Sequence, residues 1–207
     1  MARKVLLALL LTFALVGCGS SGGGAAVSGV STSDHDGYNG ILLDQPYVVP
    51  HMDLTDTDGK PFDLAAQDKR TLVFFGYTNC PDVCQVVMST IASSLTRLSD
   101  AEKAKLQVVF VTTDPARDTR QVLRRYLDRF DPSFIGATGS LDQIDALGKP
   151  MAVYVKKGQK MPSGGYEVDH SSVVVSVDKA RGDLLWTGAT SPAEISGDLT
   201  KILKGQT

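Results

Sequence analysis

A continuous apolar run that ends beside two closely spaced cysteines is the feature that most constrains how this chain can fold. Residues 71–77 form that run, which is typical of a strand buried on both faces of a sheet. Cys80 and Cys84 follow after a short turn. A helix beginning at Pro81 would place both sulfurs on one face, one turn apart. Two thiols at that separation can share a soft metal ion or close into a disulfide.

The rest of the chain alternates between strand and helix patterns after a predicted hairpin at residues 47–64, with Asp58 and Gly59 at its turn. Further strands are predicted at residues 107–113, 134–137, 152–155, 172–178 and 184–187. Helices are predicted over residues 88–98, 122–130 and 141–147, and after a capping box at Ser191. We therefore expect an α/β, thioredoxin-like fold: a central mixed sheet flanked by helices, with an N-terminal hairpin extension. The two thiols then lie at the carboxyl end of a central strand, where α/β sheets place their sites.

The N-terminus has the pattern of an exported lipoprotein. Arg3 and Lys4 precede an apolar segment, residues 5–16, which is shorter than the about 20 residues that a membrane-spanning helix needs. The segment leads into a Leu-Val-Gly-Cys sequence whose cysteine is Cys18. This sequence resembles a bacterial lipobox, in which cleavage precedes a cysteine that carries lipid. An ordinary signal peptide with a chance cysteine is the alternative.

This pattern predicts a domain organisation and a location. We expect a lipoprotein signal peptide at residues 1–17, a flexible Gly/Ser-rich tether at residues 18–40 and one folded domain at residues 41–207. The 43% apolar fraction suits a single domain with a full core. Lipid on Cys18 would hold the protein at the cell membrane, on its extracytoplasmic face.

Cysteine usage and charge narrow the chemistry further. Lipidation of Cys18 would leave Cys80 and Cys84 as the remaining two of three cysteines, in an environment where disulfides persist. A bridge between them would close so short a loop that it would add little stability, so the pair is interpreted as chemical rather than structural. The chain carries 21 basic and 23 acidic residues with no basic patch, so nucleic acid is not expected as a partner.

Two sulfurs leave a metal site incomplete, so a third ligand is needed. A helix N-terminus should also stabilise thiolates and lower their pKa. The chain has three histidines, His35, His51 and His170. His170 directly precedes a predicted strand, in a loop that packs beside the redox helix in a thioredoxin-like fold, and is the best-placed candidate; an ordinary surface-loop histidine is the alternative. Two cysteines and one histidine suit copper.

Three separated segments, residues 76–84 (GYTNCPDVC), 114–119 (DPARDT) and 168–171 (VDHS), resemble the Sco/SenC family in their order along the chain. The resemblance extends over roughly residues 48–203. It implies a membrane-tethered, thioredoxin-like copper chaperone in which Cys80, Cys84 and His170 bind Cu(I) or Cu(II). It also implies partners: the CuA-bearing subunit of cytochrome c oxidase and other copper-handling proteins.

Residue 85 departs from that family, which usually has proline there. The chain has Gln85, and we expect this to alter how the helix begins without abolishing metal binding. Asp114 is expected to end a strand, and Asp118 or Thr119 to cap a helix, rather than to bind metal.

Two other activities remain open. A thiol–disulfide oxidoreductase of the cell envelope would use the same pair to reduce partner cysteines, and its wider cysteine spacing would change the redox potential without forbidding exchange. A peroxiredoxin-like peroxidase needs only one reactive thiolate, and the adjacent second thiol and candidate histidine argue against it. Catalysis is therefore not the primary expectation.

Overall fold

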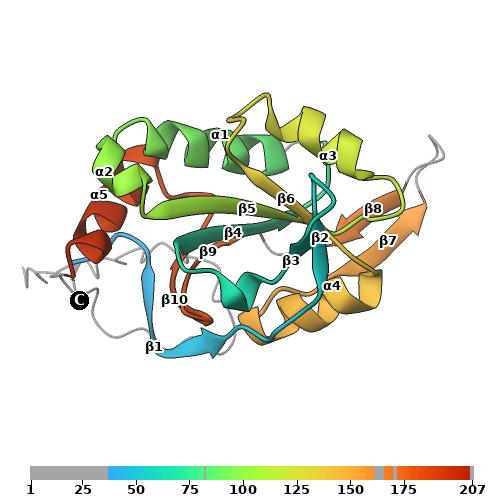
Figure 1. Ribbon diagram of the computed structural model, residues 1–207, viewed down its shortest axis with the longest axis horizontal. Coiled ribbons are helices and arrows are strands. Elements are labelled where there is room, and N and C mark those ends of the chain that lie inside the picture. Colours follow the sequence, from blue (N-terminus) through green and yellow to red (C-terminus); the bar gives the residue numbers. More distant parts are fainter. Residues whose placement is uncertain (1–36, 82, 161–165, 170–171, 206–207) are drawn as a thin grey trace, which may run out of the picture. The chain divides into compact units, whose positions relative to one another are not determined.

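The computed structural model describes residues 37–81, 83–160, 166–169 and 172–205. Its main sheet has eight strands, shown in Figure 1. In spatial order they are β1 (Ile41–Val48), β10 (Arg181–Trp186), β9 (Val174–Asp178), β4 (Arg70–Gly76), β5 (Leu106–Thr112), β6 (Ile135–Thr138), β2 (Leu54–Asp56) and β3 (Pro61–Phe62). The three strands β4, β5 and β6 run parallel, and the other pairings are antiparallel. The predicted mixed sheet is confirmed.

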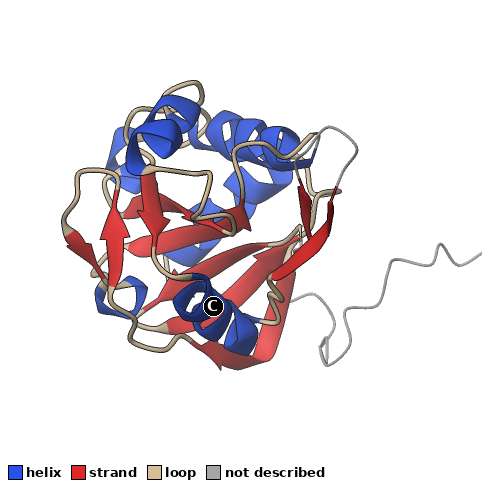
Figure 2. Ribbon diagram, turned by 90° about the vertical axis from the view of Figure 1, so that its right-hand side faces the viewer, coloured by secondary structure: helices blue, strands red, loops and turns tan. Residues whose placement is uncertain are grey.

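Helices cover both faces of this sheet (Figures 1 and 2). They are α1 (Val83–Leu95), α2 (Asp100–Lys103), α3 (Arg120–Leu127), α4 (Leu141–Gly148) and α5 (Pro192–Leu203), with short 3-10 turns η1 (Leu64–Ala66) and η2 (Lys149–Met151). Figure 1 shows α1 and α3 on one side of β4 and β5, and α4 on the other. Right-handed crossovers from β4 to β5 and from β5 to β6 explain why α1 and α3 share a face.

The central strand β4 is apolar because it is covered on both faces. Leu72, Val73, Phe74 and Phe75 are each at most 1% exposed. Phe74 meets Phe110 of β5 edge to face, with ring centroids 5.9 Å apart. The core therefore rigidly supports the point where β4 ends, and the two cysteines follow directly after it.

Two predicted elements differ from the structure. The expected strand at residues 152–155 does not form: η2 ends at Met151, the next residue, Ala152, is left-handed, and strand β7 (Lys156–Lys160) begins later. Val153 and Val155 are buried, but they lie outside the sheet. The alternation of apolar residues in this segment therefore reflects side-chain burial and not membership of a strand. The predicted hairpin is confined to β2 and β3, with its turn at Gly59 (φ +86°), because residues 47 and 48 belong to β1 and pair with β10.

The N-terminal end of the described chain is bound to α5. Asp198 is fully buried and accepts hydrogen bonds from Asn39 N (2.9 Å), Gly40 N (2.8 Å) and Trp186 Nε1 (2.9 Å). These bonds hold residues 39 and 40 against the domain. β7 pairs separately with β8 (Tyr166–Asp169). Within the described ranges, no helix is both long and apolar enough to cross a membrane.

Candidate thiol and metal centre

The thiol loop, defined here as residues 77–84, runs from the end of β4 into the first two residues of α1 and includes both predicted cysteines. Cys80 N donates to the Tyr77 carbonyl at 3.2 Å, which closes a tight turn after the strand. Cys84 N donates to Cys80 Sγ at 3.4 Å. Cys80 is 5% exposed, Cys84 is 0% exposed, and neither forms a disulfide. The structure therefore brings two thiols together in a buried position, as the spacing predicts.

The helix and the thiol pKa differ from expectation. α1 is described from Val83, so Cys80 precedes the helix and its sulfur accepts a first-turn amide, as a capping side chain does. Burial raises the pKa of Cys84 well above its usual range, and the hydrogen bond with Cys80 adds to the increase. A backbone hydrogen bond from Tyr77 acts in the opposite direction but does not prevail. The prediction of a lowered pKa was wrong for Cys84, because desolvation outweighs the helix terminus.

Gly76, the last residue of β4, allows the sulfur of Cys84 to approach the sheet. A Cβ at this position would lie 3.0 Å from Cys84 Sγ, 3.0 Å from Phe110 and 2.9 Å from Phe74. All three neighbours are buried and cannot withdraw into solvent. The absence of a side chain at residue 76 is thus a requirement of the thiol position.

We expect Gly76→Ala to displace Cys84 and to weaken Cu(I) binding by about tenfold. Overpacking should also lower the free energy of unfolding by about 1–3 kcal/mol. Competition with a Cu(I) chelator and urea unfolding measure the two effects. Gly188→Ala is the matched control, since among the described residues, apart from its chain neighbours, no heavy atom lies within 4 Å of a Cβ at that position. Equal copper affinities for the two variants would contradict the assigned contact.

Asp118 ties the thiol loop to the neighbouring strand. It is 1% exposed and accepts three hydrogen bonds, from Thr78 N (2.9 Å), Thr78 Oγ1 (2.6 Å) and Thr112 Oγ1 (2.7 Å). Burial raises the pKa of Asp118, although the bonds from Thr78 and Thr112 oppose the increase. The helix cap is Thr119, whose side chain accepts from Val122 N. Sequence reasoning missed the role of Asp118 because only the fold brings Thr78 to it.

Asp114 adds a second connection to the same loop. It is 2% exposed and forms an ion pair with Arg117. The guanidinium of Arg117 in turn lies 5.9 Å from the centroid of the Tyr77 ring. The DPARDT segment therefore supports the thiol loop from one side through two carboxylates.

The described residues supply two thiols but no third ligand. In the chain as described, no three His, Cys, Asp or Glu side chains gather closely enough to hold a metal ion. His51 is exposed and pairs with Asp63, with 2.6 Å between Nδ1 and Oδ2. His170 and Cys18, the predicted ligand and lipid site, lie outside the described residues. Gln85 is exposed in the first turn of α1, where the family's usual proline would also fit.

The sequence and the fold of this chain are similar to those of known proteins. The SCO1/SenC family model matches residues 42–204. The mitochondrial protein SCO2 of Saccharomyces cerevisiae is 35% identical over 143 residues, which is 68% of this chain and 46% of that protein. The matched region thus spans about half the length of that relative.

Solved structures resemble the fold over most of the chain. Apo Sco1 from Thermus thermophilus superposes with a TM-score of 0.70 at 32% identity, covering 82% of this chain and 97% of that one. ScoI of Bradyrhizobium japonicum, solved with copper bound, gives a TM-score of 0.65 at 31% identity and covers 74% of this chain and 98% of that one. The expected thioredoxin-like fold is confirmed by this likeness.

Proposed function

Because this chain belongs to the SCO1/SenC family, we propose that it is a membrane-anchored copper metallochaperone of the extracytoplasmic face. It binds one copper ion through Cys80, Cys84 and His170, is held at the membrane by lipid on Cys18, and assists assembly of the CuA centre of cytochrome c oxidase. The observation that carries the proposal is the buried thiol pair, in which the Cys84 amide donates to Cys80 Sγ at 3.4 Å.

The donor set of the thiol loop fits a soft metal ion. Thiolate sulfur favours Cu(I) and Zn(II) over hard cations, and the Cys80 sulfur already contacts the backbone amide of Cys84. Their burial excludes water, which would otherwise compete for the ion. Asp118 and Gly76 hold the loop and the Cys84 sulfur in position before the ion arrives. The copper ion is here the cargo of the protein.

Strand pairing supports His170 as the third ligand. β9 runs antiparallel to β4, and Val174 pairs with Phe74 near the carboxyl end of β4. The start of β9 therefore lies beside the carboxyl end of β4, from which the thiol loop emerges. His170 precedes Val174 by four residues, a length of chain that reaches up to about 14 Å. That length of chain would allow an imidazole at residue 170 to reach the thiol loop.

The oxidation state of copper provides the test of this ligand set. Two thiolates satisfy Cu(I), whereas Cu(II) gains from an imidazole, so His170→Ala should weaken Cu(II) binding by at least about tenfold and Cu(I) binding by less than about threefold. Anaerobic Cu(I) titration and aerobic Cu(II) titration of the purified protein measure both. His51→Ala, at an exposed histidine paired with Asp63, is the matched control. Equal losses in the two oxidation states would exclude the proposed role of His170.

A second function, thiol–disulfide exchange, is favoured by the contact between the two cysteines. Cys80, the more exposed of the pair, would attack a partner disulfide, and Cys84 would then displace the partner thiol. The partner disulfide gains two electrons and two protons, and Cys80 and Cys84 lose them as their own disulfide forms. Reduction of a disulfide-bonded substrate that proceeds equally with and without copper would favour this function over metal delivery.

A further inference from the structure

A shallow cavity of about 330 Å³ lies beside the thiol loop. It is lined by Thr78, Val122, Arg125, Tyr126 and Arg129. Val122, Arg125, Tyr126 and Arg129 follow the i, i+3, i+4, i+7 spacing that places side chains on one side of a helix, here α3 and the residues just after it. Thr78 belongs to the thiol loop, two residues before Cys80. An occupant of this cavity would therefore lie next to the loop that carries the thiols.

The cavity carries uncompensated positive charge. Arg125 and Arg129 are exposed, and within the described ranges neither forms an ion pair with a carboxylate. The nearest acids along the chain have other partners: Asp128 binds Arg124 at 2.8 Å, and Asp131 accepts from Ser133 N at 2.8 Å. Two like charges four residues apart repel each other, and a bound anion would relieve that repulsion.

Tyr126 forms a buried part of the cavity wall. It is 3% exposed, and its hydroxyl has no hydrogen-bond partner among the residues that the structure describes. Burial raises the pKa of Tyr126, and the charge of Cys84 adds to the increase. The guanidinium of Arg129 sits 4.7 Å from the centroid of the Tyr126 ring, which orders one of the two cations.

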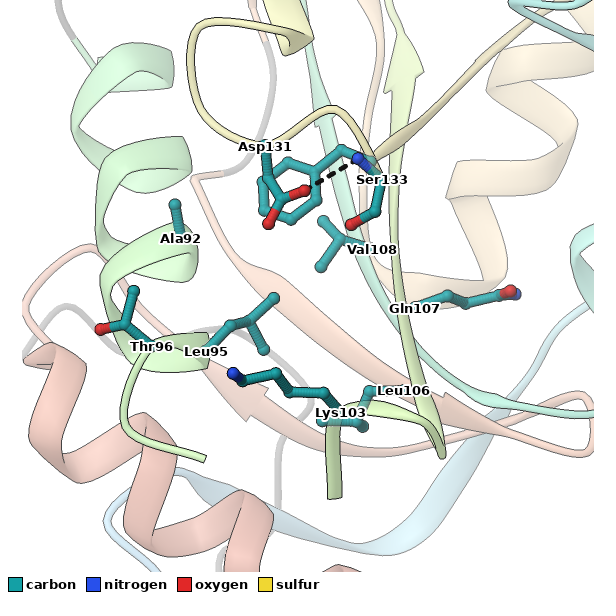
Figure 3. Close-up of a pocket in the computed structure, with 10 residues that line it drawn as sticks. Ala92, Leu95, Thr96, Lys103, Leu106, Gln107, Val108, Asp131 and Ser133 are labelled. Atoms are coloured by element: carbon teal, nitrogen blue, oxygen red, sulfur yellow. Dashed lines mark hydrogen bonds between the residues drawn. The ribbon is translucent and has the colours of Figure 1, made fainter. Parts of the chain in front are cut away.

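Another cavity, drawn in Figure 3, lacks these properties. Its volume is about 150 Å³, and it lies between α1 and the start of β5, where Leu106 lines it. Its charged side chains are engaged locally. Asp131 accepts from Ser133 N, the dashed line in Figure 3, and Lys103 pairs with Asp100 at 3.3 Å. The start of β5 is also the opposite end of the parallel strands from the thiol loop.

We propose that the cavity lined by Arg125 and Arg129 receives a carboxylate side chain from an acidic segment of the protein that exchanges copper or electrons with Cys80 and Cys84. This inference rests on the proposed function for the identity of the partner. An acidic side chain seated there would orient the partner's own thiols toward the thiol loop. The guanidinium groups suit a carboxylate because they can donate two parallel hydrogen bonds to it.

A cysteine-free peptide tests the cavity without copper. A fluorescently labelled glutamate-rich peptide and its glutamine counterpart are titrated with the reduced, metal-free full chain, and binding is followed by anisotropy at low ionic strength. The glutamate peptide should bind at least about tenfold more tightly than the glutamine peptide. The double charge reversal Arg125→Glu/Arg129→Glu should remove that difference while Cu(I) affinity stays unchanged.

The matched control is Arg97→Glu/Arg181→Glu, which makes the same net charge change at exposed arginines elsewhere. Equal weakening by both double variants would show general charge attraction and overturn the proposal. Equal binding of the two peptides, or displacement of the glutamate peptide by inorganic phosphate at equal concentration, would also overturn it. If the protein binds no copper in titration, the proposed function is overturned. The cavity proposal is tested separately, because the peptide assay contains no metal.

Discussion

Replacing Cys84 with serine should lower the Cu(I) affinity of the protein by at least about 100-fold. This is more than the loss typical of replacing a residue that only supports a metal ligand. A hydroxyl is a hard donor that stays protonated at neutral pH, so it cannot replace a thiolate toward a soft ion. The change is nearly isosteric at a position that is 0% exposed, so loss of packing should contribute little. Anaerobic titration against a competing Cu(I) chelator measures the affinity.

Two comparisons sharpen this experiment. Val86→Ser places a hydroxyl at an exposed position of the same helix and should leave Cu(I) affinity unchanged. Cys80→Ser should cause a loss of the same order as Cys84→Ser, because both sulfurs are needed. A Cys84→Ser protein that unfolds normally in urea and still binds Cu(I) within about threefold of the parent would exclude the thiol pair as the copper site.

Asp118→Ala should destabilise the domain and weaken Cu(I) binding together. The substitution leaves Thr78 N, Thr78 Oγ1 and Thr112 Oγ1 without their acceptor. Unsatisfied buried donors cost about 1–3 kcal/mol each and are not additive, so we expect the free energy of unfolding to fall by about 2–4 kcal/mol. Release of the thiol loop should reduce Cu(I) affinity by about tenfold, as for other supporting residues of metal sites. Urea unfolding and chelator competition measure these quantities.

Asp118→Asn separates positioning from charge. Its single amide oxygen can occupy the place of Oδ2, which accepts from Thr78 N and Thr112 Oγ1, so two of the three bonds can persist. The Asp118→Asn variant should therefore bind Cu(I) nearly as tightly as the parent, and more tightly than the Asp118→Ala variant. If asparagine is as defective as alanine, the negative charge of Asp118 matters to the site and the positioning role assigned to it is insufficient.

Much of the fold could be predicted because its signals are local. Ser191 accepts from Glu194 N in the predicted capping box, and Pro192 opens α5 as expected. The buried strands β4 and β5 match their apolar runs closely. The failure at residues 152–155 has a physical cause: alternating apolar residues report which side chains are buried, whereas a strand also needs ladder pairing with another strand, and none is assigned to this segment within the described residues.

The candidate site was predictable only in part. Cys80 and Cys84 stand out because they are close in sequence, and the turn before α1 brings the Cys80 sulfur to the Cys84 amide. The supporting groups lie far away along the chain, as Asp118 is 40 residues from Thr78. Their roles depend on which strand lies next to which, and periodicity does not encode that order.

The amino-acid sequence by itself determined that two thiols would follow a buried strand and meet at the start of a helix, because backbone geometry acts over a few residues. Only the tertiary structure decided how those thiols are held. The sulfur of Cys84 lies against Gly76, and burial raises the pKa of this thiol although a backbone hydrogen bond from Tyr77 lowers it. Desolvation depends on the atoms that packing brings together from distant segments, so no local pattern could have revealed it.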